Sequence, residues 1–140
     1  MKIITLTQLI ALNVCEPQIN LFKTHCGESV SVSKKTAVSL AHVFHFDDVS
    51  RCLLSKNRLA EYEKTLLPLW WVNKKLTDPA WAKFMDFSLL KTEKLSASEL
   101  AKHYKAKEAA WCKYKKASKK AAIKLDKAKA ILFVKFYNAA

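Results

Sequence analysis

Hydrophobic positions recur with helical spacing over most of the chain, and they predict short helices in residues 1–57. Thr5, followed three residues later by a glutamine, fits a capping box that opens a helix running to about residue 15. Pro17 opens a second helix, because proline is tolerated at a first helical position. Gly27 is suited to end that helix in a left-handed conformation.

The rest of this N-terminal segment predicts two more helices. Residues 29–33 alternate between polar and apolar side chains; a short strand is an alternative there, but we favour a connector. Ser33 then caps a third helix that continues to about Phe44. Asp47 caps a fourth, with Asp48 in its first turn, where the helix dipole favours an acidic residue. The prediction is a compact helical head.

An 11-residue repeat defines a second segment, residues 58–95. One apolar row of this repeat consists of Leu59, Trp70 and Trp81. A period of eleven corresponds to about 3.67 residues per turn, which is close to a straight helix. Pro68 and Pro79 follow the same spacing, and they predict breaks or kinks in the segment, with Asp78 as an N-cap before the second proline.

The third segment, residues 96–140, predicts one long amphipathic helix. Ser96 and Glu99 form a capping box, and neither glycine nor proline follows, so the helix is expected to reach about Tyr137. Three apolar or small rows with a period of eleven make its packing face. These rows are Leu100, Trp111, Ala122 and Phe133; His103, Tyr114, Leu125 and Phe136; and Ala106, Ala117, Ala128 and Ala139. The expected fold class is all-α, and the long helix packs on the preceding helices or on a second copy, as a homodimer.

Parts of the chain resemble a family of small phage and prophage proteins in which a short helical head precedes tandem AWAEYEK-like repeats. The segments that carry the resemblance are CEPQINLF at 15–22, FDD at 46–48, LLS at 53–55 and LAEYEK at 59–64, with degenerate repeats PAWAKF at 79–84 and AWCKYKKA at 110–117. The repeat is lost at 90–95, and the chain is unusually rich in lysine. The resemblance implies a phage or mobile-element accessory protein, and it transfers no functional residue.

The composition excludes several classes of nucleotide-binding site. Gly27 is the only glycine, whereas phosphate-binding loops and dinucleotide fingerprints need several. The formal net charge is +13, and residues 91–140 hold fourteen lysines against four acidic residues. Arg51 and Arg58 are the only arginines, so a nucleic-acid partner would be contacted at its phosphate backbone and not at its base edges.

The leading functional hypothesis is therefore a non-catalytic protein that binds nucleic acid or a nucleic-acid-handling host complex. Inhibition of a host defence nucleoprotein, as in an anti-CRISPR, is the form that the phage resemblance implies. The long helix carries lysine rows that we expect to lie opposite its packing face and to contact phosphates or an acidic partner. The candidate binding residues are Lys102, Lys105, Lys113, Lys116, Lys120, Lys124, Lys127 and Lys135.

Three alternatives stay open at this point. The lysines can simply keep a long helix soluble. The chain can instead be a protein-interaction or structural module that docks an acidic partner through its apolar stripe and the Trp70–Trp71 pair. We favour packing of both indoles in the interior over exposure, and we expect Trp81 and Trp111 to be core residues. Adsorption to an anionic membrane surface is the weakest alternative, since the apolar stripe is needed for packing.

Neither catalysis nor a metal or other cofactor is expected. His42 and His45 lie three residues apart and His25 precedes a cysteine, but zinc needs four convergent ligands and no paired spacing supplies them. Asp47 and Asp48 are explained by helix capping. The four cysteines form no CxxC pair and are expected to be reduced.

We expect a cytoplasmic protein without a membrane partner. The N-terminal 15 residues superficially resemble a lipoprotein signal, but Thr5 and Asn13 are among the polar residues that interrupt the apolar run. No apolar stretch approaches the ~20 residues of a membrane-spanning helix.

Overall fold

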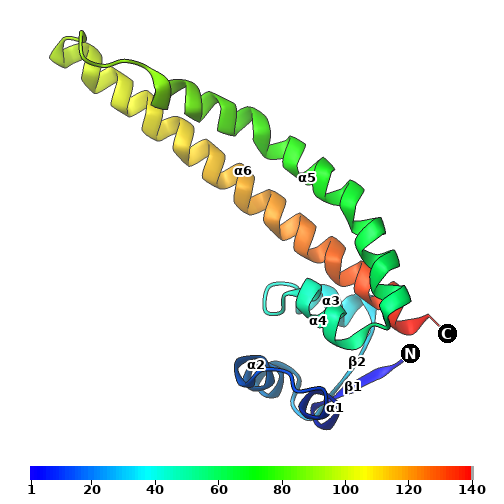
Figure 1. Ribbon diagram of the computed structural model, residues 1–140. Coiled ribbons are helices and arrows are strands. Elements are labelled where there is room, and N and C mark those ends of the chain that lie inside the picture. The colour runs from blue at the N-terminus through cyan, green and yellow to red at the C-terminus, as the bar shows by residue number, and fades with distance from the viewer. Residues whose placement is uncertain (140) are drawn as a thin grey trace. The chain divides into compact units, whose positions relative to one another are not determined.

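The computed structural model describes residues 1–139, and most of them are helical. The elements are β1 (Ile3–Thr5), α1 (Leu6–Ala11), α2 (Glu16–Cys26), β2 (Ser29–Ser31), α3 (Lys34–Ser39), α4 (Phe46–Leu53), α5 (Lys56–Leu89) and α6 (Ala97–Asn138) (Figure 1). The predicted all-α class is confirmed, with the addition of one small sheet.

The chain divides into two compact units that share the long helices. Unit 1 comprises Met1–Leu69 and Leu125–Ala140, and unit 2 comprises Trp70–Lys124. Unit 1 therefore holds all the short elements, the first part of α5 and the last part of α6. Unit 2 is a helical hairpin built from the remainder of α5 and α6. This division differs from the three expected segments, because each long helix contributes to both units.

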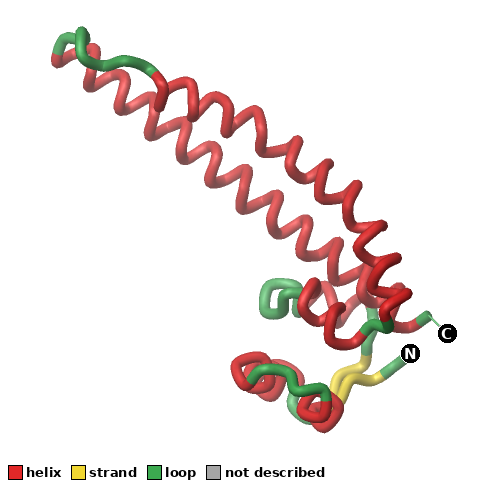
Figure 2. Tube along the Cα trace, in the orientation of Figure 1, coloured by secondary structure: helices red, strands yellow, loops and turns green. Residues whose placement is uncertain are grey.

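The two strands pair antiparallel, with Ile4 opposite Val30 in the middle of the register (Figure 2). The backbone N–H of Leu6 donates to the carbonyl of Glu28 at 2.9 Å and extends the pairing by one bond. The expectation of a connector at residues 29–33 was therefore wrong for Ser29–Ser31. Its partner strand lies more than twenty residues earlier in the sequence, so the local pattern did not reveal the pairing.

Most of the predicted caps of unit 1 are confirmed. The Thr5 hydroxyl accepts a hydrogen bond from the backbone N–H of Gln8 at 3.2 Å. Ser33 and Thr36 form a reciprocal capping box at the start of α3. Gly27 ends α2 with φ of +69°, a conformation that glycine adopts without steric cost. Helices α1 and α3 are shorter than predicted, because they end at residues 11 and 39.

Asp47 was predicted as an N-cap, and this was wrong. Helix α4 begins at Phe46, whose ring is buried, and the cap residue is His45. Asp47 instead binds two other helices of unit 1. Its Oδ1 accepts from the Tyr62 hydroxyl at 3.0 Å, and its Oδ2 accepts from the Lys129 ammonium at 2.5 Å. The carboxylate thereby links α4 with the first part of α5 and the last part of α6.

The breaks predicted at the two prolines of α5 do not occur. Helix α5 continues through Pro68 and Pro79, and Asp78 lies inside it and not at a cap. Each interior proline costs about 3 kcal/mol of helix stability. Helical hydrogen bonds on both sides and packing on α6 offset that cost, through Tyr62 on Phe136 in unit 1 and Trp81 on Tyr114 in unit 2.

Helix α6 begins and ends where the sequence predicts. The Ser96 hydroxyl accepts from the backbone N–H of Glu99 at 3.2 Å, and the Glu99 carboxylate accepts from the backbone N–H of Ser96 at 3.1 Å. In unit 2 the residues most buried on this helix are Ala110 and Ala121, each 4% exposed. They keep the predicted period of eleven but lie one position before the predicted row through Trp111. Small side chains allow α5 and α6 to approach closely, and the large indole is displaced to the edge.

Candidate functional site: exposed lysines and aromatic side chains of unit 2

Six of the eight candidate lysines lie on the part of α6 that belongs to unit 2, and all six are exposed. We call them the lysine surface: Lys102, Lys105, Lys113, Lys116, Lys120 and Lys124. At 3.6 residues per turn they fall within an arc of about 100° around the helix, and they extend over about 33 Å of its axis. The helix thus presents a row of cations on one side, flanking and not directly opposite its packing face.

The charge of the lysine surface is not neutralised by acidic neighbours. Among residues 1–139, none of the six ammonium groups lies within ion-pair distance of a carboxylate. The stretch 97–124 contains two acidic residues, Glu99 and Glu108. Glu99 is engaged in the capping box, and Glu108 lines a hollow on another side of the helix. Six unpaired positive charges therefore follow one side of α6, an arrangement that favours a polyanionic partner.

The other two candidate lysines belong to unit 1. Lys127 and Lys135 are both exposed, and the Lys135 ammonium lies 5.3 Å from the centre of the Phe136 ring. Lys129, which was not a candidate, is the lysine of α6 that takes part in an ion pair, with Asp47. The sequence did not predict this ion pair, since Asp47 belongs to an element far from Lys129 along the chain.

Trp70 and Trp71 are both exposed, at 44% and 50%, so the expectation that both pack in the interior was wrong. Their rings meet edge to face with centroids 5.1 Å apart. The Lys74 ammonium lies 5.7 Å from the Trp70 ring and 5.2 Å from the Trp71 ring, within cation–π distance of each. The pair therefore forms a preorganised aromatic and cationic patch on α5.

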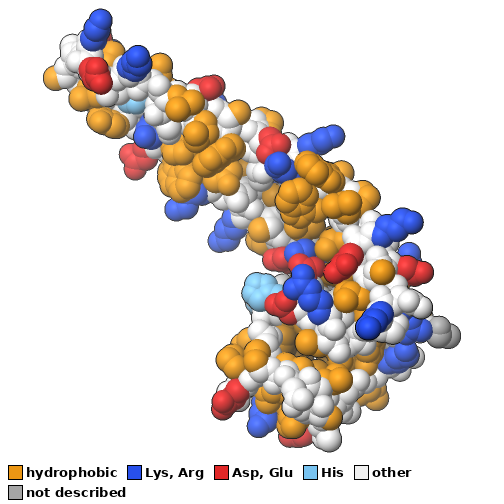
Figure 3. All heavy atoms as spheres, viewed as in Figure 1, with side chains coloured by type: hydrophobic (Ala, Val, Ile, Leu, Met, Phe, Trp, Pro, Cys, Tyr) orange, Lys and Arg blue, Asp and Glu red, His pale blue; other side chains and the backbone are white. Residues whose placement is uncertain are grey.

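A second group of aromatic side chains joins the two helices of unit 2. Trp81 lies 5.0 Å from Tyr114, and Phe84 lies 4.9 Å from Trp111, measured between ring centroids. Trp81 and Trp111 are nevertheless 42% and 39% exposed, so the prediction that they are core residues was wrong. Hydrophobic side chains are visible on the outside of the two long helices (Figure 3).

These rings border a shallow hollow of about 610 Å³, which we call the aromatic hollow. It is lined by Trp81, Phe84, Tyr104, Lys107, Glu108 and Trp111. Tyr104 and Lys107 were not singled out from the sequence, although their spacing from Trp111 places all three on one side of α6. By helical geometry the aromatic hollow and the lysine surface lie about 150° apart around α6, so they are distinct surfaces.

The histidines and cysteines do not assemble into a recognisable site. His25, His42 and His45 are exposed. Within residues 1–139 no group of three histidine, cysteine or acidic side chains is placed to hold a metal ion. All four cysteines are free thiols, and burial raises the pKa of the Cys26 thiol.

No helix in the described part of the chain combines the length and the apolar character that crossing a membrane requires. Comparison with protein-family models, with curated proteins and with solved structures gave no match.

Proposed function

We propose that the protein is a non-catalytic nucleic-acid-binding protein that contacts phosphates through the lysine surface of unit 2. The observation that carries this proposal is the group of six exposed lysines on one side of α6, none of them paired with a carboxylate in the described residues. Lysine is a compact, strongly hydrated charge that attracts phosphate without reading base edges. Binding independent of sequence is the expected consequence. A nucleic-acid-handling host complex, such as a defence nucleoprotein, would offer the same phosphates.

The proposal makes a quantitative statement about salt. If all six lysines neutralise a phosphate, the logarithm of the binding constant falls with the logarithm of salt concentration with a slope of about −5 for duplex DNA and about −4 for a single strand. Between roughly 50 and 200 mM salt the affinity should then drop about a thousandfold. If the lysines only keep the helix soluble, no binding to nucleic acid is expected at any of these salt concentrations.

The test compares two variants with the same total charge. The test variant reverses four members of the lysine surface: Lys113→Glu, Lys116→Glu, Lys120→Glu and Lys124→Glu. The matched control reverses four exposed lysines elsewhere: Lys64→Glu, Lys75→Glu, Lys91→Glu and Lys94→Glu. Fluorescence anisotropy with labelled duplex DNA and RNA measures affinity, and circular dichroism checks that both variants stay helical. We expect the test variant to lose at least a hundredfold in affinity and the control to lose much less. If both variants lost affinity equally, the loss would depend only on net charge, and this result would contradict the proposal.

A second candidate function is docking of a protein partner, and the exposed Trp70–Trp71 pair favours it. Tryptophan is enriched among residues that dominate protein interfaces, and Lys74 beside both rings suits an acidic partner. The apolar rows of α6 are less suited, because several of their members in unit 2, such as Tyr114 and Ala117, are half-buried. Pull-down with Trp70→Ala/Trp71→Ala against the lysine variants separates the two functions. Partner loss with the tryptophan variant alone would favour docking.

A further inference from the structure

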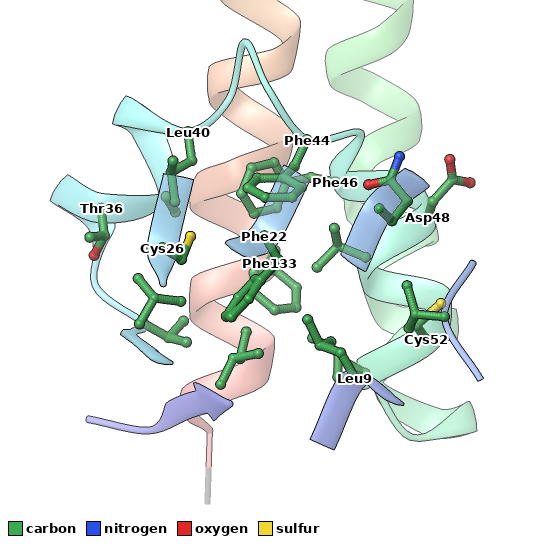
Figure 4. A pocket seen from close by; sticks show the side chains of 18 of the residues that line it. Leu9, Phe22, Cys26, Thr36, Leu40, Phe44, Phe46, Asp48, Cys52 and Phe133 are labelled. Carbon is green, nitrogen blue, oxygen red and sulfur yellow. The ribbon is translucent and has the colours of Figure 1, made fainter. Parts of the chain in front are cut away.

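A hollow in unit 1 has walls made predominantly of hydrophobic side chains, and it is separate from the residues of the lysine surface. Its volume is about 100 Å³. The walls come from the two strands, from α1 to α4 and from the last part of α6. Four phenyl rings gather at its centre, those of Phe22, Phe44, Phe46 and Phe133 (Figure 4). The hollow therefore lies where the short elements of unit 1 meet α6.

Water is a poor occupant of this space. A buried water molecule needs two to four polar partners. Among the few polar residues of the wall, Thr36 already donates its hydroxyl hydrogen to the carbonyl of Ser31 at 2.8 Å. The Asp48 carboxylate accepts from Arg51 at 3.3 Å. Gln18 and Ser31 also line the hollow, but its surface is almost entirely hydrocarbon and sulfur, which offers water little to bind.

The size and the walls of the hollow instead fit a small hydrocarbon. Protein interiors are normally close-packed, and voids larger than a water molecule are few. An apolar cavity of about 150 Å³, made by truncating a core leucine in another protein, stays dry and binds benzene. We propose that the hollow of unit 1 binds a small apolar molecule, the size of a benzene ring or a short alkyl chain. This site is independent of the proposed nucleic-acid binding.

A ligand can reach the hollow from solvent. Leu40, Phe44 and Val49 line it and are only half-buried, and Cys52 lines it while remaining exposed. Cys26 and Cys52 lie on different sides of the phenyl rings (Figure 4). A molecule seated among the rings would therefore shield Cys26, the less exposed of these two thiols, from an alkylating reagent.

The four native cysteines supply a direct test with internal controls. Cys26 and Cys52 line the hollow, whereas Cys15 and Cys112 do not, and all four are free thiols. The alkylation rate of each is measured by mass spectrometry on the full chain, with and without benzene, and each thiol is compared with its own rate. At about ten times the dissociation constant, we expect Cys26 to react about tenfold more slowly. Cys52 should slow less because of its exposure, and Cys15 and Cys112 should not change.

Two substitutions tie the protection to the hollow. Val49→Phe places a ring in the space and should abolish protection of Cys26, whereas Val72→Phe, on an exposed position of unit 2, should leave it intact. If circular dichroism shows that Val49→Phe is unfolded, Val49→Ala replaces it and should retain protection. No slowing of Cys26 at saturating benzene, equal slowing of all four thiols, or full protection in a folded Val49→Phe variant would overturn the proposal.

Discussion

Removing the charge of Lys129 tests how much the interactions of Asp47 with Lys129 and Tyr62 contribute to the stability of unit 1. The Lys129 ammonium lies 2.5 Å from Asp47 Oδ2, and the two side chains are 19% and 34% exposed. Exposed ion pairs contribute about 0–1 kcal/mol to stability, while breaking a fully buried pair costs about 3–5 kcal/mol. A pair at this depth lies between those limits. We therefore expect Lys129→Met to lower the free energy of unfolding by about 2 kcal/mol.

A double-mutant cycle with Asp47→Asn isolates the interaction itself, because asparagine can still accept the hydrogen bond of the Tyr62 hydroxyl. We expect a coupling energy of about 1–2 kcal/mol. Stability is followed by urea denaturation and by hydrogen exchange of the amides of unit 1, and urea is used because guanidinium would screen the charges. The exposed Arg51–Asp48 pair, with both side chains 63% exposed at 3.3 Å, is the matched control and should couple by no more than about 0.5 kcal/mol. Coupling below about 0.3 kcal/mol at Asp47 and Lys129 would refute the reasoning.

Three further predictions concern other contacts of the fold. Burial, and then the Asp47 carboxylate, raise the pKa of the Tyr62 phenol above its ordinary value. As pH rises, the unfolded chain therefore loses this proton before the folded protein does. The free energy of unfolding should fall above about pH 10, by up to about 1.4 kcal/mol per pH unit. In urea denaturation at several pH values, Tyr62→Phe should not show this fall, and the same pH dependence in the variant would contradict the prediction. Trp81→Ala removes the contact with Tyr114 and should cost about 2 kcal/mol, less than for a fully buried indole, measured by urea denaturation. Ser96→Ala removes the N-cap of α6 and should cost about 1 kcal/mol, with faster hydrogen exchange confined to the first turn.

Features that depend on near neighbours in the sequence were predicted well. The caps at Thr5, Ser33 and Ser96, the positive φ of Gly27 and the long C-terminal helix all follow from residues within a few positions of one another. The 11-residue period of α6 was also recovered. In unit 2 the row through Trp111 was one residue off, because the choice between alanine and tryptophan at the helix contact depends on how closely the helices approach. That distance is a property of the pair of helices and not of either sequence segment.

Features that depend on distant residues were missed for the same reason. The strand at Ser29–Ser31 forms because residues 3–5 pair with it. Aspartate is a common helix N-cap, but Asp47 instead accepts hydrogen bonds from Tyr62 and Lys129, which lie on two other helices. The exposure of the lysine surface followed from periodicity alone, since all six lysines recur on one side of α6. The aromatic hollow is lined by residues of both α5 and α6, so it could not be predicted from the sequence of either helix alone.

The central claim, phosphate binding by the lysine surface, is tested most directly by the salt dependence of nucleic-acid affinity in the wild-type protein and the two matched charge-reversal variants. We predict a slope of about −5 on duplex DNA for the wild type and for the control variant. The Lys113, Lys116, Lys120 and Lys124 reversal should flatten that slope and weaken binding at every salt concentration. No measurable binding by the wild type at about 50 mM salt, or the same slope in all three proteins, would contradict the account.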